Sequence, residues 1–93
     1  MIFEWDPQKA ADNENKHGVS FLQATEAFRD PKLVLAEDAS HSNAEPRYLA
    51  FGRVGAGILT VRFTPRGERV RIIGAGYWRR GKAYYEQANR LHR

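Results

Sequence analysis

Apolar and polar residues alternate with a period of two in the second half of the chain, and this pattern requires strands there. Segments 58–64 and 69–75 both show the alternation. Because successive side chains of a strand point to opposite faces of a sheet, one set of positions must face a core. The positions predicted to do so are Leu59, Val61, Phe63, Val70 and Ile72. Arg62 and Arg71 then share the opposite, open face of the sheet across a hairpin.

Basic charge is concentrated in this half of the chain. Residues 47–93 carry ten arginines and one lysine against two acids, a net charge of +9, whereas residues 1–46 carry four basic and nine acidic side chains, a net charge of −5. Arginine presents a planar fork of donors that suits phosphate, and like charges on neighbouring strands repel unless an anion lies between them. Arg62 and Arg71 therefore indicate a structured surface for nucleic-acid phosphates. The alternative is that they are solvated or form ion pairs with the acidic N-terminal half.

Composition excludes several classes of protein and site. Without cysteine the chain has no disulfide and no thiolate metal site, and no apolar run reaches the length of a membrane span. The three histidines are scattered and the acids lack metal-ligand spacing, so neither a metal nor another cofactor is expected. His41 and His92 are too isolated to indicate chemistry. Residues 1–93 are predicted to form one domain in the cytoplasm.

Capping and turn residues divide the chain into elements. Asp6 is a predicted N-cap and Gly18 a left-handed C-cap, while Ser20 and Gln23 predict a capping box. The predicted elements are a strand at 2–5, helices at 7–16 and 20–28, strands at 33–36, 47–54, 58–64 and 69–75, turns at 55–57 and 64–67, and a helix at 78–91. The predicted fold is α+β: a short N-terminal strand, two helices, a twisted, mainly antiparallel sheet of about four strands, and a C-terminal helix.

Two series of residues, one in each half of the chain, resemble a known family. The first comprises Phe3-Glu4-Trp5-Asp6-Pro7, Lys9-Ala10, Asn13, Lys16-His17-Gly18-Val19-Ser20-Phe21, Ala24, Phe28 and Asp30-Pro31. The second comprises Arg47, Gly52, Leu59-Thr60-Val61, Arg66 and Val70-Arg71-Ile72-Ile73. In this order they resemble the BrnT toxins. The resemblance implies a RelE-like fold, a ribonuclease toxin of a type II toxin–antitoxin pair, a BrnA-like ribbon-helix-helix antitoxin as partner, and operator DNA bound by the pair.

Metal-independent cleavage of RNA needs a base for the ribose 2′-hydroxyl, a cation for the phosphorane and an acid for the leaving 5′-oxygen. His17 is the candidate for proton transfer, because histidine exchanges a proton near neutral pH, and Lys16 is its candidate helper. The alternative role of His17 is to form hydrogen bonds to the last carbonyls of the first helix. Arg62 and Arg71 are expected to stabilise the phosphate. The candidates for further contact with RNA are Arg66, Arg79, Arg80 and Trp78.

The chain departs from the family pattern at the end of the last predicted strand. The family continues there with serine, alanine and arginine, whereas this chain has Gly74-Ala75-Gly76, and Gly81 stands near the place of a helical glutamate. Either Arg79 or Arg80 supplies the cation, or catalysis is weakened. Three functions stay open: a ribonuclease toxin, a weakened homologue that binds an antitoxin and operator DNA, and an RNA-binding domain unrelated to toxins.

Overall fold

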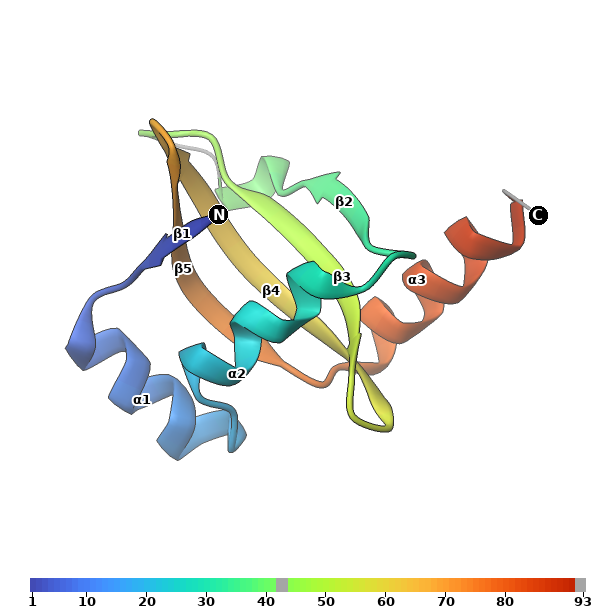
Figure 1. Cartoon of the computed structure of the whole chain (residues 1–93), viewed down its shortest axis with the longest axis horizontal. Coiled ribbons are helices and arrows are strands. Elements are labelled where there is room, and N and C mark those ends of the chain that lie inside the picture. The colour runs from blue at the N-terminus through green and yellow to red at the C-terminus, as the bar shows by residue number, and fades with distance from the viewer. Residues whose placement is uncertain (42–43, 92–93) are drawn as a thin grey trace.

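The computed structural model describes residues 1–41 and 44–91, apart from the side chain of His41, so His92 lies outside the described residues. Helices lie on both faces of a twisted sheet (Figure 1). The elements are β1 (Ile2–Glu4), α1 (Pro7–His17), α2 (Phe21–Thr25), the 3-10 helix η1 (Glu26–Arg29), β2 (Val34–Glu37), the 3-10 helix η2 (Ala39–His41), β3 (Tyr48–Val54), β4 (Gly57–Arg66), β5 (Arg69–Gly76) and α3 (Arg79–Leu91).

The described part of the chain contains one five-stranded sheet with the order β1-β5-β4-β3-β2. Strands β2 to β5 are antiparallel neighbours, whereas β1 pairs with β5 in parallel. The fold is therefore α+β as predicted, but the sheet is mixed and has five strands instead of about four. The difference arises because the N-terminal strand joins the sheet at its edge.

Side-chain caps fix where the first two helices begin, and a glycine ends the first of them. A carboxylate oxygen of Asp6 accepts a hydrogen bond from the backbone two residues on, at 2.9 Å, and Gly18 ends α1 with a φ of 69°. The hydroxyl of Ser20 accepts from the backbone N–H of Gln23 at 3.0 Å. The side chain of Gln23 donates to the hydroxyl of Tyr77 instead, at 3.3 Å. The predicted capping box is therefore only half formed, because its second side chain is used in a tertiary contact.

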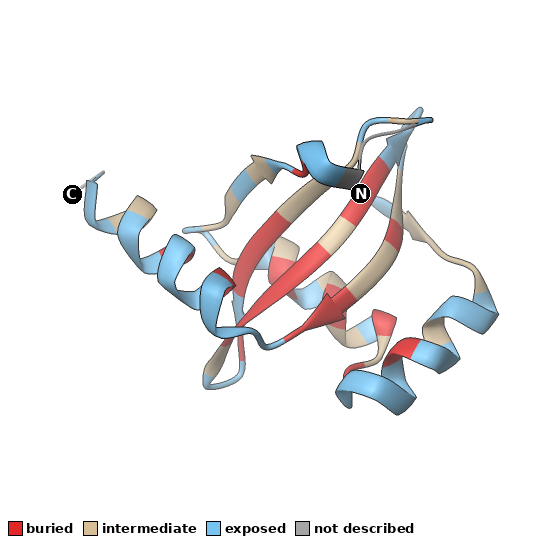
Figure 2. Ribbon diagram, turned by 180° about the vertical axis from the view of Figure 1, so that it is seen from behind, coloured by how far each residue is buried: buried red, intermediate tan, exposed pale blue. Residues whose placement is uncertain are grey.

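The main core lies between the sheet and the helices α1, α2 and η1. The alternation prediction is confirmed, since Leu59, Val61, Phe63 and Ile72 are buried in this core and Val70 packs against it. The buried residues run along the middle of the strands in Figure 2. A β-carbon on Gly52 would overlap the backbone of Ala27, so the glycine lets η1 lie directly on β3.

The predicted turn at 64–67 is wrong by two residues. Strand β4 continues to Arg66, which pairs with Arg69, and the chain reverses at Gly67, whose φ is 60°. Strand β4 pairs with β3 only as far as Phe63, so beyond that point one of its sides carries no ladder. Pro65, which lacks an N–H, is tolerated within the strand for that reason.

The second face of the sheet is covered at both ends, and the open face predicted for it is wrong. Helix α3 covers Thr60, with Gly81 at the point of closest approach. At the other end the hydroxyl of Thr64 donates to the carbonyl of Pro46 at 2.6 Å, and Thr64 is buried. Arg62 lies between these two covers, with 32% of its side chain exposed.

Helix α3 packs on the sheet through Gly81 and Tyr85, which are its buried residues. Tyr84 and Leu91 are exposed. The hydroxyl of Tyr85 donates to Asp30 at 2.7 Å. This bond ties the helix to the segment before β2 and sets its rotation.

Candidate active site

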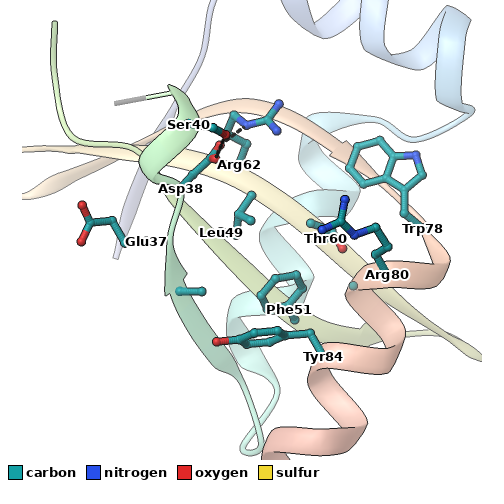
Figure 3. Close-up of a pocket in the computed structure, with 12 residues that line it drawn as sticks. Glu37, Asp38, Ser40, Leu49, Phe51, Thr60, Arg62, Trp78, Arg80 and Tyr84 are labelled. Atoms are coloured by element: carbon teal, nitrogen blue, oxygen red, sulfur yellow. Dashed lines mark hydrogen bonds and ion pairs between the residues drawn. The ribbon is translucent and has the colours of Figure 1, made fainter. Parts of the chain in front are cut away.

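Arg62 is held in place by a carboxylate from the loop after β2. Its Nε donates to Oδ2 of Asp38 at 2.7 Å, and only 7% of the Asp38 side chain is exposed. In the sheet Arg62 pairs with Gly74, and the register of the β4–β5 ladder shifts directly after it. Figure 3 shows the guanidinium beside Asp38 and Ser40, with Trp78 and Arg80 across the hollow. The ion pair fixes the stem of Arg62 in one orientation.

One side of Arg62 faces a cleft of about 230 Å³ between α1 and the sheet, here named the basic cleft. Its lining residues are Lys9, Asp12, Asn13, Lys16, His17, Arg62, Ile73, Gly74 and Trp78. Four residues singled out from the sequence thus meet here: Lys16 and His17 from the last turn of α1, Arg62 from β4, and Trp78 from just before α3. Three cations and a histidine against the single carboxylate of Asp12 favour an anionic ligand.

His17 stands edge-on to Trp78 in the basic cleft. Their ring centroids are 5.1 Å apart and the planes meet at 87°. The contact helps to position the imidazole in the basic cleft. The N–H of Gly18 bonds to the carbonyl of Glu14 at 2.9 Å, so a backbone group already helps to cap the end of α1.

Arg71 lies outside the lining of the basic cleft. Its Nη1 donates to Glu4 at 2.8 Å, and Arg69 reaches the other oxygen of Glu4 at 3.4 Å. The hydrogen bond from Arg71 is the main cause that lowers the pKa of Glu4 below its usual value. Arg62 and Arg71 therefore each pair with a separate carboxylate and do not line a common cleft.

The other predicted contacts with RNA are dispersed. Arg66 forms an ion pair with Glu45 at 3.3 Å, away from the basic cleft. Arg79 is exposed at the first position of α3. Arg80 lines a neighbouring cleft of about 530 Å³, here named the aromatic cleft, which shares Arg62 and Trp78 with the basic cleft.

Packing accounts for two of the three glycines at which the chain departs from the family pattern. A β-carbon on Gly76 would run into the indole of Trp78, and one on Gly81 would run into the hydroxyl of Thr60. At Gly74 the nearest atom would be Oδ1 of Asn13 at 3.7 Å, which leaves room for a side chain. Trp78 thus occupies the space in which a longer side chain at 76 would lie.

Sequence reasoning missed two residues of this region. Lys9 lies seven residues before Lys16, and this helical spacing is a signal that could have placed both on one face of α1. Asp38 had no such signal, because its partner Arg62 is 24 residues away. Among the described residues no group of three His, Asp or Glu side chains could hold a metal ion.

Residues 5–81 match a family model described as the ribonuclease toxin BrnT of type II toxin–antitoxin systems. The chain belongs to the BrnT toxin family. The resemblance deduced from the sequence is thereby confirmed, and a type II system implies an antitoxin partner. The match contains the whole basic cleft of this BrnT chain and stops before Tyr84 in α3. A comparison with curated proteins gave no match. In the part of the chain that the structure describes, no helix has the length and apolar character of a membrane span.

Proposed function

We propose that this chain is a metal-independent endoribonuclease of 93 residues forming one toxin domain, which cleaves RNA in the cytoplasm and thereby inhibits translation. The observation that supports the proposal is the convergence of Lys16, His17 and Arg62 on the basic cleft from separate elements. A BrnA-like ribbon-helix-helix antitoxin would neutralise the toxin by covering this cleft, and the pair would bind operator DNA.

The proposed reaction divides the work among the cleft residues. His17 and Lys16 share the proton transfers: one removes the proton of a ribose 2′-hydroxyl, and the other protonates the leaving 5′-oxygen. The 2′-oxygen attacks phosphorus, the bond from phosphorus to the 5′-oxygen breaks, and a cyclic phosphate results. Arg62 stabilises the charge that develops on the phosphorane, and Lys9 holds a neighbouring phosphate oxygen.

Asp38 and Arg71 have supporting roles in the proposed site. Asp38 keeps the Arg62 stem oriented through its 2.7 Å bond. Arg71 was the other candidate for charge stabilisation, but its bond to Glu4 favours a role in holding β1 against β5. Arg66, which is paired with Glu45, and Arg79, which lies outside both clefts, are not among the phosphate contacts of this proposal.

The test is cleavage of single-stranded RNA by the purified chain in the presence of a chelator. His17→Ala and Arg62→Ala are each expected to lower the rate by about 100-fold or more, because they remove a proton-transfer group and the phosphate cation. Arg90→Ala removes the same charge from an exposed helix position and should keep the wild-type rate. Full activity of Arg62→Ala would contradict the proposal. An equally large loss in Arg71→Ala, at unchanged stability, would return Arg71 to the reaction.

A second candidate function is a weakened toxin homologue that binds an antitoxin and operator DNA without cleaving RNA. Gly74 and Gly76 favour it, because they lack the polar side chains that the family pattern has there. The same assay separates the two functions. Absence of cleavage by the wild-type chain, together with restored cleavage in Gly74→Ser, where space exists, would favour the weakened homologue.

A further inference from the structure

We propose that the aromatic cleft is a binding subsite for one base of the RNA, next to the phosphate held in the basic cleft. The inference rests on the proposed ribonuclease function and adds the part of the substrate that the cleft recognises. The two clefts adjoin each other, because Arg62 and Trp78 belong to the linings of both. A nucleotide whose phosphate meets Arg62 on one side therefore has a second hollow within reach on the other.

The aromatic cleft has a floor from the sheet and a wall from α3 (Figure 3). Leu49 and Phe51 form the apolar floor, and Trp78 and Tyr84 stand along the helix side. The rings of Phe51 and Tyr84 lie 5.0 Å apart and are tilted by 32°, so Phe51 supports Tyr84 from one side. Tyr84 is 51% exposed and Trp78 is 38% exposed. Two partly exposed rings beside one hollow form a stacking platform of the kind that binds bases of single-stranded RNA.

Charge and aromatic rings together favour a nucleotide over a purely apolar peptide at this hollow. Arg80 comes from the first turn of α3 and lies across the cleft from the Asp38–Arg62 pair (Figure 3). A guanidinium and aromatic rings at one rim suit a phosphate joined to a planar base. On the opposite wall the carboxylate of Asp38 accepts from Arg62 and Ser40, so the Asp38–Arg62 pair adds little net charge against a phosphate.

Binding is tested without cleavage, so that the result does not depend on catalysis. Trp5→Phe leaves Trp78 as the sole tryptophan and thus as a fluorescent reporter. In this background, dinucleotides with a 2′-deoxy sugar at the cleavage position should quench Trp78 fluorescence in a saturable way. Tyr84→Ala should weaken their affinity about tenfold or more, whereas Tyr84→Phe should keep it. Ribose 5-phosphate, which lacks a base, should bind equally to the parent and to Tyr84→Ala.

The outcomes separate this inference from the proposed function. Equal dinucleotide affinity of the parent and Tyr84→Ala would overturn the base subsite, even if the wild-type chain cleaves RNA. Dinucleotide binding that depends on Tyr84 would support the subsite, even if the wild-type chain lacks cleavage. If an antitoxin protects Tyr84 from solvent and no dinucleotide binds there, the cleft is a protein interface and the inference is wrong.

For a chain that cleaves RNA, steady-state kinetics give an independent reading. Tyr84→Ala should raise KM for RNA and flatten the preference among bases next to the cut, while kcat for the best site changes less than threefold. A loss confined to kcat, with base preference unchanged, would contradict a base-binding role.

Discussion

At the scale of single residues, buried polar groups are what define the candidate site. The carboxylate of Asp38 is almost fully shielded from solvent. Its negative charge is therefore stabilised by Arg62 and by neighbours in the same loop, such as Ser40. The same low exposure makes an unpaired polar group costly. Asp38 and Thr60 both lie near the clefts. The Asp38 carboxylate is paired with Arg62, whereas the Thr60 hydroxyl has no hydrogen-bond partner among the described residues.

Asp38→Asn is expected to slow RNA cleavage about tenfold or more, because the amide cannot hold the Arg62 guanidinium as a carboxylate does. The measurement is the single-turnover rate at saturating RNA, with unfolding by urea as the check on stability. Glu86→Gln removes the same charge from an exposed position of α3 outside both clefts and should leave the rate within twofold. Equal rates for the two variants would show that Asp38 does not position Arg62.

Thr60→Val is expected to raise the free energy of unfolding by about 1 kcal/mol. Among the described residues, Thr60 Oγ1 is a buried side-chain atom without a hydrogen-bond partner, and valine has the same shape without the hydroxyl. Urea unfolding measures the change. A destabilised Thr60→Val variant would mean that the hydroxyl has a partner such as bound water.

At the scale of elements, two contacts attach the first strand and the last helix to the sheet. Strand β1 is three residues long and pairs only with β5, so the ion pairs of Glu4 with Arg69 and Arg71 reinforce a short ladder. Helix α3 meets the sheet at Gly81. Both contacts join segments far apart in sequence, and Gly81 also lines the aromatic cleft.

The contribution of Glu4 to stability should depend on pH in a defined direction. Its pKa is lowered from 4.5 in the folded protein, so the stabilisation is fully present above pH 4.5 and is lost as the pH falls through the lower, folded value. The unfolding free energies of the wild type and Glu4→Gln should therefore differ at pH 7 and converge in acid. A difference that grows below pH 4.5 would contradict the assigned ion pair.

Gly81→Ala is expected to destabilise the protein by about 1–3 kcal/mol through overpacking, although alanine favours a helix by about 1 kcal/mol over glycine. The new methyl would meet Thr60 and the ring of Phe51. Gly74→Ala, for which space exists, is the matched control and should be neutral or slightly stabilising. Thermal unfolding compares the two. Equal midpoints would show that α3 shifts on the sheet at little cost.

At the scale of the whole molecule, the two oppositely charged halves are partly neutralised against each other. Arg62, Arg66, Arg69 and Arg71 from the basic half pair with Glu4, Asp38 and Glu45 from the acidic half. Part of the charge asymmetry, which indicates a nucleic-acid ligand, therefore serves to form ion pairs between distant segments of the chain. The basic groups of the clefts that carry no such pair in the described structure are Lys9, Lys16 and Arg80.

Local patterns predicted most of the elements and the core face of the sheet, and long-range contacts account for what they missed. Alternation placed Leu59 and Val61 in the core, and Asp6 capped α1 as expected, because these features depend on neighbours in sequence. The parallel pairing of β1 with β5 depends on segments more than 60 residues apart. The Asp38–Arg62 pair likewise has no local signal, so the orientation of Arg62 in the candidate site could not be predicted from the sequence.

The salt dependence of RNA binding should therefore reflect the few cations of the clefts and not the full charge of the basic half. With Lys9, Lys16 and Arg80, the cleft cations that have no internal carboxylate, on phosphates, the plot of log affinity against log salt should have a slope of about −2, since each contact on single-stranded nucleic acid contributes about −0.7. Lys9→Ala should make the slope less steep by about 0.7, whereas Arg66→Ala, whose guanidinium is paired with Glu45, should leave it unchanged. Fluorescence anisotropy of a labelled RNA oligomer measures both slopes. A change of slope in Arg66→Ala equal to that in Lys9→Ala would mean that RNA displaces the internal carboxylates and uses the arginines of the whole sheet.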